Sequence, residues 1–324
     1  MTEDELVAAI RARLAGVPSG KVRIGIGDDA AVWQPSRGNR SVISTDALVE
    51  GVHFTRAGMT AADAGHRALA AALSDLAAMG ARPVLATVAL GFPKDTDTAW
   101  ILACYDGIAA LAKRARCAIA GGDLTRAPAV TLAITVVGEV RLSNLKLRSG
   151  ARAGDVFALT GVLGASAAGL ALVSAGKAAS GDAAADAASA AYRRPEPRLR
   201  EGAWLGGSWL VRAMRDTSDG LSTDLRRLCT ASGVGAVVET IPVAPAARAI
   251  AARSGDDPEA WARDGGEDFE LLVAVDKHGF AHLARRFRAT FGKELLRIGH
   301  ATEGAGVRLA NGAAIAPAGW DHVR

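Results

Sequence analysis

The sequence predicts a protein of the α/β (α+β) class with two domains, and three observations support this prediction. Strand-like and helix-like segments alternate through the first half of the 324 residues. A polar segment, RLSNLKLRSGARAGD (141–155), then interrupts the alternation, and an apolar run, VFALTGVLGASAAGLALVSAG (156–176), restarts it. We therefore expect an N-terminal domain over residues 1–140 and a C-terminal domain over residues 141–324.

The first half contains an ordered series of helices and strands. Helices are expected over residues 1–16, 61–80 and about 98–116. Strands are expected over residues 41–47, 83–92, 117–123 and 129–140. Thr60 and Gly80 fit the N-cap and C′ positions of the 61–80 helix, because a threonine hydroxyl can accept a free backbone N–H and glycine tolerates the left-handed conformation.

The second half shows a similar but less regular pattern. Strands are expected over residues 235–241, 269–275 and 295–299, with a helix after TSDG (217–220). An Ala/Gly/Ser-rich stretch at 175–191 is compatible with either a loop or an exposed helix, and its composition indicates no chemistry.

Composition argues against several classes of protein. The 38 Lys and Arg residues exceed the 34 Asp and Glu residues by only four and are scattered, so nucleic-acid binding is not indicated. No apolar run approaches the roughly 18 residues that a membrane-spanning helix needs, and the N-terminus lacks the apolar core of a signal peptide. We expect a cytoplasmic protein whose three cysteines, Cys104, Cys117 and Cys229, are buried thiols, because none has metal-ligand spacing.

Two adjacent carboxylates, Asp28 and Asp29, follow a Gly-x-Gly turn in RIGIGDDAAV (23–32). The string G-I-G-D-D-A matches the dinucleotide-binding pattern G-x-G-x-x-A, but that site requires a helix to begin at the turn. Here AAVWQPSRGNR (30–40) predicts another short strand, and bare carboxylates would repel a pyrophosphate. If a phosphate binds here, a cation must accompany it; otherwise the pair forms an ordinary Asx turn.

Similar acidic clusters recur at the predicted ends of strands and helices. In the first half they comprise Ser44, Thr45 and Asp46, then Asp75, and then Gly121, Gly122 and Asp123. In the second half they comprise Asp216, Ser218, Asp219 and Asp224, and then Glu267, Asp268 and Glu270. Any one of them could be structural, but together they favour cation binding, because unneutralised carboxylates repel one another. Oxygen-only donors favour Mg²⁺ over Zn²⁺.

The residues alone thus indicate a Mg²⁺-dependent enzyme acting on phosphates, with an unknown substrate. Both a Walker A loop and the glycine-rich loop of protein kinases are absent. Arg148 in KLRSGA (146–151) is a candidate cation for a polyphosphate, although a surface arginine is the plainer interpretation.

Seven segments, in order along the chain, resemble the thiamine-monophosphate kinase family. They are GIGDDAAV, STDALVEGVHF, LSDLAAMGARP, GGDLTR, RSGARAGD, SDGLSTDL and GGEDFELL, followed by a terminal GWDHV. This family belongs to the aminoimidazole ribonucleotide synthetase superfamily. The resemblance implies a two-domain fold of that type: an N-terminal mixed sheet with helices, whose strands form a barrel in a homodimer, and a C-terminal α/β sandwich.

The resemblance also implies an activity and a set of site residues. The expected reaction transfers the γ-phosphoryl group of ATP directly to thiamine monophosphate, giving thiamine diphosphate and ADP, with several Mg²⁺ ions bound. Positions matching magnesium ligands are Asp29, Ser44, Thr45, Asp46, Asp75, Asp123, Asp216 and Asp219. Positions matching nucleotide contacts are Tyr105, Gly122, Asp123, Arg148 and Ser218, and those matching the thiamine-phosphate pocket are His53, Glu267 and Trp320. The catalytic group implied is Asp46, Asp75, Arg148 and Asp219.

The sequence departs from the family pattern at three positions. Ala72 replaces an asparagine, Leu124 replaces a threonine after Gly-Gly-Asp, and Val323 replaces a phenylalanine near the C-terminus. Two alternative functions stay open: another ATP-dependent enzyme of the superfamily, such as aminoimidazole ribonucleotide synthetase, or a non-catalytic protein that binds nucleotide or Mg²⁺. The second would be expected to lose ligands, whereas every principal carboxylate is present here.

Overall fold

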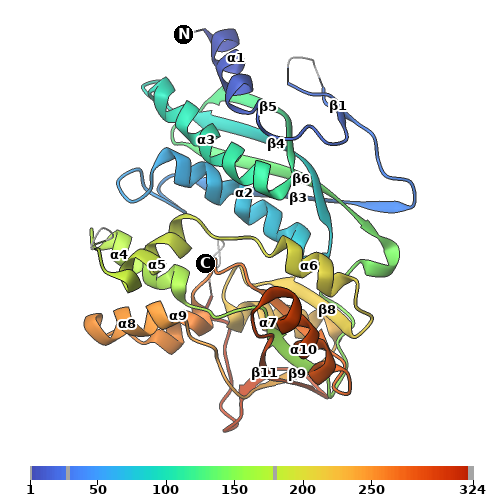
Figure 1. The fold of residues 1–324 in the computed structure, drawn as a ribbon. Helices are drawn as coiled ribbons and strands as arrows, with labels where there is room; N and C mark the ends of the chain where they lie inside the picture. The colour runs from blue at the N-terminus through green and yellow to red at the C-terminus, as the bar shows by residue number, and fades with distance from the viewer. Residues whose placement is uncertain (1, 27–29, 178–180, 320–324) are drawn as a thin grey trace. The chain divides into compact units, whose positions relative to one another are not determined.

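A computed structural model describes residues 2–26, 30–177 and 181–319 of the chain. These residues form two compact units (Figure 1). The N-terminal unit comprises the chain up to Leu76 together with Ala81–Leu142, and the C-terminal unit comprises Ala77–Gly80 together with the chain from Ser143 onward. Among the described residues, no helix is long and apolar enough to cross a membrane.

The N-terminal unit is built on a four-stranded mixed sheet. Its elements are α1 (Glu3–Arg13), β1 (Val22–Ile24), β2 (Val32–Trp33), β3 (Asn39–Val49), α2 (Ala61–Ala78), β4 (Arg82–Phe92), α3 (Thr98–Ala115), β5 (Ala118–Arg126) and β6 (Thr131–Arg141). The strand order is β3-β6-β4-β5, so β3 and β5 form the two edges. Only β4 and β5 are parallel, which confirms the expected mixed sheet.

The predicted helix over residues 61–80 is confirmed as α2, with the expected signals at both ends. The hydroxyl of Thr60 accepts a hydrogen bond from the backbone N–H of Asp63 at 3.2 Å, and Gly80 has φ +69°. β1 precedes the Gly-x-Gly segment, and the next described element after it is strand β2, which pairs with β1, so the predicted short strand is confirmed. Val22 and Trp33 of this pair pack on a small core in the sheet.

The C-terminal unit is a six-stranded sheet with helices on both faces. Its strands are β7 (Val156–Leu159), β8 (Val211–Asp216), β9 (Gly235–Val238), β10 (Leu271–Val275), β11 (Leu296–Thr302) and β12 (Val307–Leu309), in the order β12-β9-β11-β7-β10-β8. Its helices are α4 (Ala165–Ser174), α5 (Ala183–Arg193), α6 (Leu199–Gly206), α7 (Leu221–Ser232), α8 (Pro245–Ser254), α9 (Pro258–Asp264) and α10 (Phe280–Phe291), and the 3-10 turn η1 (Leu142–Asn144) precedes the unit. The expected α/β sandwich is confirmed.

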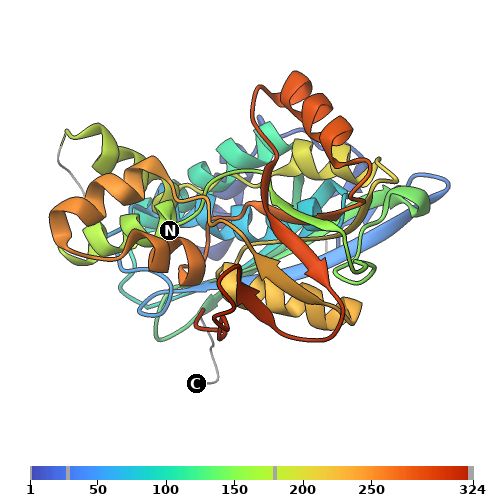
Figure 2. The same ribbon diagram turned by 90° about the horizontal axis from the view of Figure 1, so that it is seen from below.

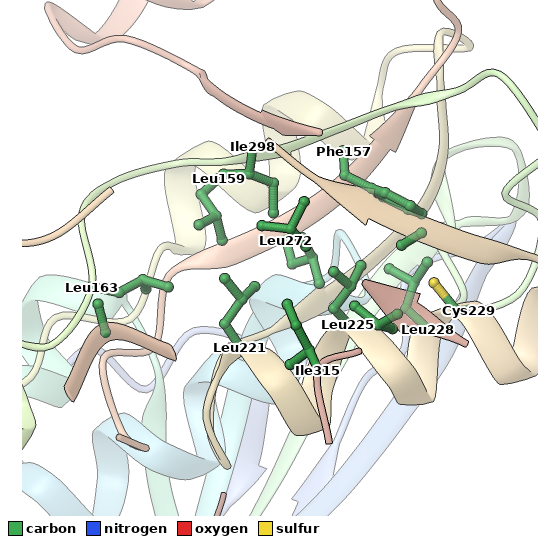
Figure 3. Close-up of a cluster of buried hydrophobic side chains, with 14 of the residues drawn as sticks. Phe157, Leu159, Leu163, Leu221, Leu225, Leu228, Cys229, Leu272, Ile298 and Ile315 are labelled. Atoms are coloured by element: carbon green, nitrogen blue, oxygen red, sulfur yellow. The ribbon is translucent and has the colours of Figure 1, made fainter. Parts of the chain in front are cut away.

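Two hydrophobic cores hold this sandwich together, one on each face of the sheet. The larger joins Leu159 and Leu272 of the sheet to Leu221 and Leu225 of α7 (Figure 3). The other packs strand residues against Phe287 of α10. Helices α7 and α10 accordingly lie on opposite sides of the sheet (Figure 2).

Two open questions about local structure are settled by the described residues. Part of the Ala/Gly/Ser-rich stretch forms α5, and this helix buries Ala185, Ala188 and Tyr192 on one side, so it is neither a loop nor fully exposed. The three cysteines are buried and free, as predicted. Burial raises the pKa of each thiol to about 12, which makes them unreactive at neutral pH.

Candidate active site

Strand β3 presents oxygen-bearing side chains toward α2. The hydroxyl of Ser44 donates a hydrogen bond to the carboxylate of Asp75 on α2. Because side chains alternate along a strand, Asp46 lies on the same face as Ser44, and its Oδ1 accepts the backbone N–H of Ala47 at 2.8 Å. Asp75 is half-buried, as expected for a carboxylate held by a partner at the edge of a core. Ser44 and Asp75 are therefore in contact, and Asp46 lies on the same face of β3; these three residues are called the Asp46 group below.

Strand register places Asp123 away from this group. Asp123 pairs with Ala89, Ala89 with Ala133, and Ala133 with Ala47. Since Ala47 and Asp46 point to opposite faces of β3, Asp123 lies on the face turned away from α2. The two carboxylates also lie on opposite edge strands, three inter-strand spacings or about 14 Å apart across the sheet. Thr45, whose hydroxyl meets that of Thr135, shares the face of Asp123.

Gly122 is required by the packing of the sheet itself. A Cβ atom at this position would lie 2.0 Å from the backbone oxygen of Val88 in β4, whereas a Cβ at Gly121 would meet nothing within 4 Å. The sequence suggested that glycine here admits a ligand to the backbone. In the structure, position 122 requires glycine because the backbone of β4 lies too close to leave room for a side chain.

The loop after β3 fixes the orientation of His53. The backbone N–H of Val49 donates to Nδ1 of His53 at 3.0 Å, so neutral His53 carries its proton on Nε2. Arg56 follows three residues later, forms an ion pair with Glu50 at 2.9 Å, and lies 5.1 Å from the ring centre of Trp100. His53 is thus presented as an Nε2–H donor on an anchored loop.

Tyr105, a predicted nucleotide contact, lies on α3 and is buried within the N-terminal unit. Burial, with a smaller contribution from Cys104, raises the pKa of its phenol. Asp28, Asp29 and Trp320 fall outside the described residues, so their predicted roles stay predictions.

In the C-terminal unit, two predicted motifs lie side by side. The backbone N–H of Glu267 donates to the carbonyl of Ser218 at 2.8 Å, and that of Phe269 donates to the carbonyl of Thr217 at 3.0 Å. Glu267 and Phe269 adopt φ of 66° and 51°, a left-handed conformation that costs non-glycine residues energy. The strain is held at the residue expected to bind thiamine phosphate.

Asp216 and Asp219 belong to a dense acidic cluster with Asp224. The backbone N–H of Asp219 donates to Asp224 at 3.0 Å, and Arg215 pairs with Asp224 at 2.5 Å. Burial raises the pKa of Asp224 to about 7, and the nearby charges of Asp216 and Asp219 add to this effect while Arg215 opposes it. Arg227 pairs with Asp219 at the exposed side of the cluster.

Two long-range contacts of Asp268 and Glu270, which follow Glu267 in the chain, are absent from the sequence-based prediction. Arg198 holds Glu270 with two hydrogen bonds, at 3.0 Å from Nε and 2.5 Å from Nη2. Asp268 accepts the backbone N–H groups of Gly164 and Ser166 at the start of α4, and burial raises its pKa to about 7. The partners are more than 70 residues apart in sequence, so no local pattern could have paired them.

Arg148 lies on an anchored segment with its side chain exposed. Lys146, two residues earlier, is buried and donates to the carbonyls of Ser208 and Val211 at 2.9 and 2.8 Å. Burial lowers the pKa of Lys146. The carbonyl of Leu147 accepts the N–H of Met214 in β8 at 2.9 Å. The fixed backbone and the exposed guanidinium suit Arg148 to bind an anion.

The donor chemistry of these clusters fits Mg²⁺. Within the described ranges, no three His, Cys, Asp or Glu side chains gather closely enough to hold a metal ion by themselves. Mg²⁺ usually takes one or two protein carboxylates and completes its shell with water and substrate phosphate. The hydroxyl of Ser44 and the carboxylates of Asp46 and Asp75 are oxygen donors that suit such partial coordination, and so are the carboxylates of Asp216 and Asp219.

Comparison with known proteins identifies the fold family. Residues 27–140 match the N-terminal domain of the AIR synthase related proteins, and residues 152–310 match their C-terminal domain. The thiamine-monophosphate kinase of Synechococcus elongatus is 39% identical over 289 residues, which cover 87% of this chain and 85% of the relative.

Solved structures agree with this family. The thiamine-monophosphate kinase of Stenotrophomonas maltophilia superimposes with a TM-score of 0.86 and 35% identity, covering 97% of this chain and 98% of that one. A structure described as AaThiL complexed with AMPPCP and TMP gives a TM-score of 0.81 at 26% identity, covering 99% and 96% of the two chains. Matches of this extent in both domains show that the chain belongs to the thiamine-monophosphate kinase family of AIR synthase related proteins.

Proposed function

We propose that this protein is an ATP-dependent phosphotransferase that converts thiamine monophosphate and ATP to thiamine diphosphate and ADP. The observation that carries the proposal is the match of nearly the whole chain to a thiamine-monophosphate kinase, with a TM-score of 0.86. A second relative, at a TM-score of 0.81, has been solved with AMPPCP and TMP bound. The seven ordered motifs lie within this matched length.

Binding and positioning account for most of the proposed catalysis. Bound Mg²⁺ would neutralise phosphate charge and polarise the transferred group. Asp46 and Asp75, with Ser44, are the proposed ligands in the N-terminal unit, and Asp216 and Asp219 are those in the C-terminal unit. No general base is needed, because the accepting phosphate of thiamine monophosphate is already ionised at neutral pH.

Three further residues have proposed roles toward the substrates. Arg148 offers an exposed guanidinium to the phosphates of ATP, where transition-state charge is spread over the phosphoryl oxygens. The Nε2–H of His53 can donate to the phosphate of thiamine monophosphate. The carboxylate of Glu267, held in a strained conformation, can bind the polar or cationic part of thiamine.

We further propose that the protein is a homodimer joined through the open face of the N-terminal sheet. Ile43 on this face is 64% exposed, and Thr45, Ala47 and Ala89 are also exposed, although strands of this length need a covered face. In a closed barrel of two sheets, the β5 edge of one copy would meet the β3 edge of the other. This pairing would bring the strand that carries Asp123 next to the strand that carries Asp46 in a second copy.

Mixed dimers test this arrangement. Asp46→Asn and Asp123→Asn homodimers should each be inactive, and unfolding and refolding the two together should restore part of the activity, because one site in each mixed dimer then carries no substitution. Restoration would not occur if both carboxylates act within one chain.

Separate incubations with two substrates distinguish thiamine-monophosphate kinase activity from aminoimidazole ribonucleotide synthetase activity. Purified protein is incubated with ATP, Mg²⁺ and either thiamine monophosphate or formylglycinamidine ribonucleotide. We expect thiamine diphosphate from the first and no turnover of the second. Consumption of the second alone would assign the protein to aminoimidazole ribonucleotide synthesis, and ATP binding without either reaction would indicate a regulator.

A further inference from the structure

We propose that Asp268 and Arg198 are positioning residues for thiamine monophosphate, because they hold the strained segment that presents the carboxylate of Glu267. This segment comprises residues 267–270 and leads directly into β10. The inference rests on the proposed function, in which Glu267 binds the polar or cationic part of thiamine. Neither positioning residue is among the proposed ligands of Mg²⁺, ATP or thiamine monophosphate.

One side of the segment is hydrogen-bonded to the loop that follows β8. The backbone N–H of Glu267 donates to the carbonyl of Ser218 at 2.8 Å. The backbone N–H of Phe269 donates to the carbonyl of Thr217 at 3.0 Å. Just before the segment, a Cβ at Gly266 would lie 2.5 Å from the carbonyl oxygen of Ser218, so the two backbones are in close contact. The segment therefore lies directly against the residue that is predicted to contact ATP.

The backbone of the segment is in a conformation that needs support from its surroundings. Glu267 and Phe269 have φ of 66° and 51°. Non-glycine residues remain in this left-handed region only where surrounding contacts hold them there. Phe269 is held by burial, since its side chain is 4% exposed, whereas Glu267 is half-buried. The intervening residue Asp268 and the following residue Glu270 supply further contacts.

Asp268 joins the segment to the start of α4. Its Oδ2 accepts the backbone N–H of Gly164 at 2.6 Å, and its Oδ1 accepts that of Ser166 at 3.1 Å. The N–H groups at the start of a helix have no partners within the helix, so this distant carboxylate satisfies them. Because both carboxylate oxygens are engaged, Asp268 fixes the position of the adjacent Glu267 relative to α4.

Arg198 holds the other end of the segment through Glu270. Its guanidinium donates two hydrogen bonds to the carboxylate of Glu270, at 3.0 Å from Nε and 2.5 Å from Nη2. The hydroxyl of Thr160 donates to the same carboxylate at 2.5 Å. A Cβ at Gly161 would lie 2.3 Å from Oε1 of Glu270, so the carboxylate lies directly on the backbone of Gly161. A two-point contact from Arg198 restricts both the position and the rotation of this carboxylate.

The two contacts are expected to act on substrate binding more than on phosphoryl transfer. A carboxylate that is already held in its binding position loses little freedom when the substrate arrives, so Asp268 and Arg198 should increase the affinity of Glu267 for its ligand. Asp219, a proposed Mg²⁺ ligand, has a separate hydrogen bond from its backbone N–H to Asp224 at 3.0 Å. We therefore expect weaker effects on Mg²⁺ and ATP.

Steady-state kinetics of the full-length protein test the proposal. Asp268→Asn keeps the shape of the side chain but leaves one acceptor oxygen for two N–H groups, and it should raise the KM for thiamine monophosphate roughly tenfold. Arg198→Lys keeps the positive charge but loses the two-point contact, and it should raise this KM roughly threefold. The kcat and the KM for ATP should change by less than about twofold.

A double-substitution cycle separates positioning from a direct or general structural role. Asp268→Asn should raise the KM for thiamine monophosphate in the wild type but should have little effect in Glu267→Ala, because the carboxylate that it positions is already absent. Asp182→Asn is the matched control, since it makes the same chemical change at the N-cap of α5 in the same unit. This control should leave the KM unchanged.

Hydrogen exchange at the amides of Glu267 and Phe269, measured without substrate, reports the holding of the segment directly. Exchange should be faster in Asp268→Asn than in Asp182→Asn. Unchanged exchange would overturn the proposal, as would an unchanged KM in both folded variants or a full KM increase in the Glu267→Ala background. If Asp268→Asn does not fold, Arg198→Lys undergoes the same tests. If the wild type forms no thiamine diphosphate, the proposed function fails, and exchange alone decides whether these residues hold the segment.

Discussion

The adjacent glycines of β5 provide a sharp test of the packing argument, because the structure predicts opposite outcomes for the same substitution. An alanine Cβ at position 122 would lie 2.0 Å from the oxygen and 2.9 Å from the carbon of the Val88 carbonyl. Neither contact involves a flexible side chain, so β4 and β5 must separate. At position 121 the same Cβ would meet nothing within 4 Å.

The expected cost follows from overpacking in a well-packed structure. Gly122→Ala should destabilise the N-terminal unit by about 1–3 kcal/mol. For a unit of this size, each kcal/mol lowers the melting temperature by about 3–4 °C, so a decrease of about 3–12 °C is expected. Gly121→Ala should change the free energy of unfolding by no more than about 0.5 kcal/mol.

Thermal melts and urea denaturation of both variants measure this difference, and the KM for ATP reports displacement of Asp123. We expect Gly122→Ala alone to melt earlier and to raise the KM. The degree of burial alone would predict that Gly121→Ala is the more destabilising substitution, because Gly121 is half-buried and Gly122 is exposed. Equal melting temperatures of the two variants would show that contact with the Val88 carbonyl does not destabilise Gly122→Ala.

Four further substitutions test the site and its supports. Asp46→Asn should lower turnover at least about 100-fold with a nearly unchanged melt, since it removes a proposed magnesium ligand from a half-exposed position. Glu270→Gln should destabilise the C-terminal unit by about 3–5 kcal/mol, because the largely buried charge of Arg198 loses its partner. The control, Glu239→Gln in the more exposed pair with Arg297, should destabilise it by at most about 1 kcal/mol. Burial alone would raise the pKa of Glu139, but hydrogen bonds from Lys21, Ser36 and Asn39 outweigh it and lower this pKa to about 2. Glu139→Gln should therefore destabilise the protein by about 3 kcal/mol near pH 7. This destabilisation should become progressively smaller as the pH falls from about 4.5 to 2, because Glu139 then takes up a proton.

Each of these predictions has a distinct contrary result. Near-normal turnover of Asp46→Asn would remove it from the proposed ligands. Similar urea midpoints for Glu270→Gln and Glu239→Gln would mean that burial of the first pair does not matter. A stability difference for Glu139→Gln that is independent of pH would show that its charge is not the stabilising feature.

Local pattern was enough to predict much of the fold. The helix over 61–80 could be predicted because its caps, Thr60 and Gly80, and its apolar repeat all lie in one short segment. The absence of a helix after the Gly-x-Gly turn could be predicted for the same reason. The ordered motifs, through their resemblance to a known family, identified the fold and the activity.

Contacts between residues far apart in sequence could not be predicted in this way. Asp46 and Asp123 both read as magnesium ligands, yet the non-sequential order β3-β6-β4-β5 places them on opposite edges and faces of one sheet. Likewise, Arg198 meets Glu270 only because the C-terminal sheet forms. Such pairs depend on strand order and register, which no local periodicity specifies.

The fate of the transferred phosphoryl group distinguishes direct transfer to thiamine monophosphate from hydrolysis of ATP. The protein is incubated with [γ-³²P]ATP, Mg²⁺ and thiamine monophosphate, and the products are separated by chromatography. Direct transfer predicts that the label appears in the terminal phosphate of thiamine diphosphate, in an amount equal to the ADP formed. Label found only in inorganic phosphate, or ADP formed without thiamine diphosphate, would contradict the proposed reaction.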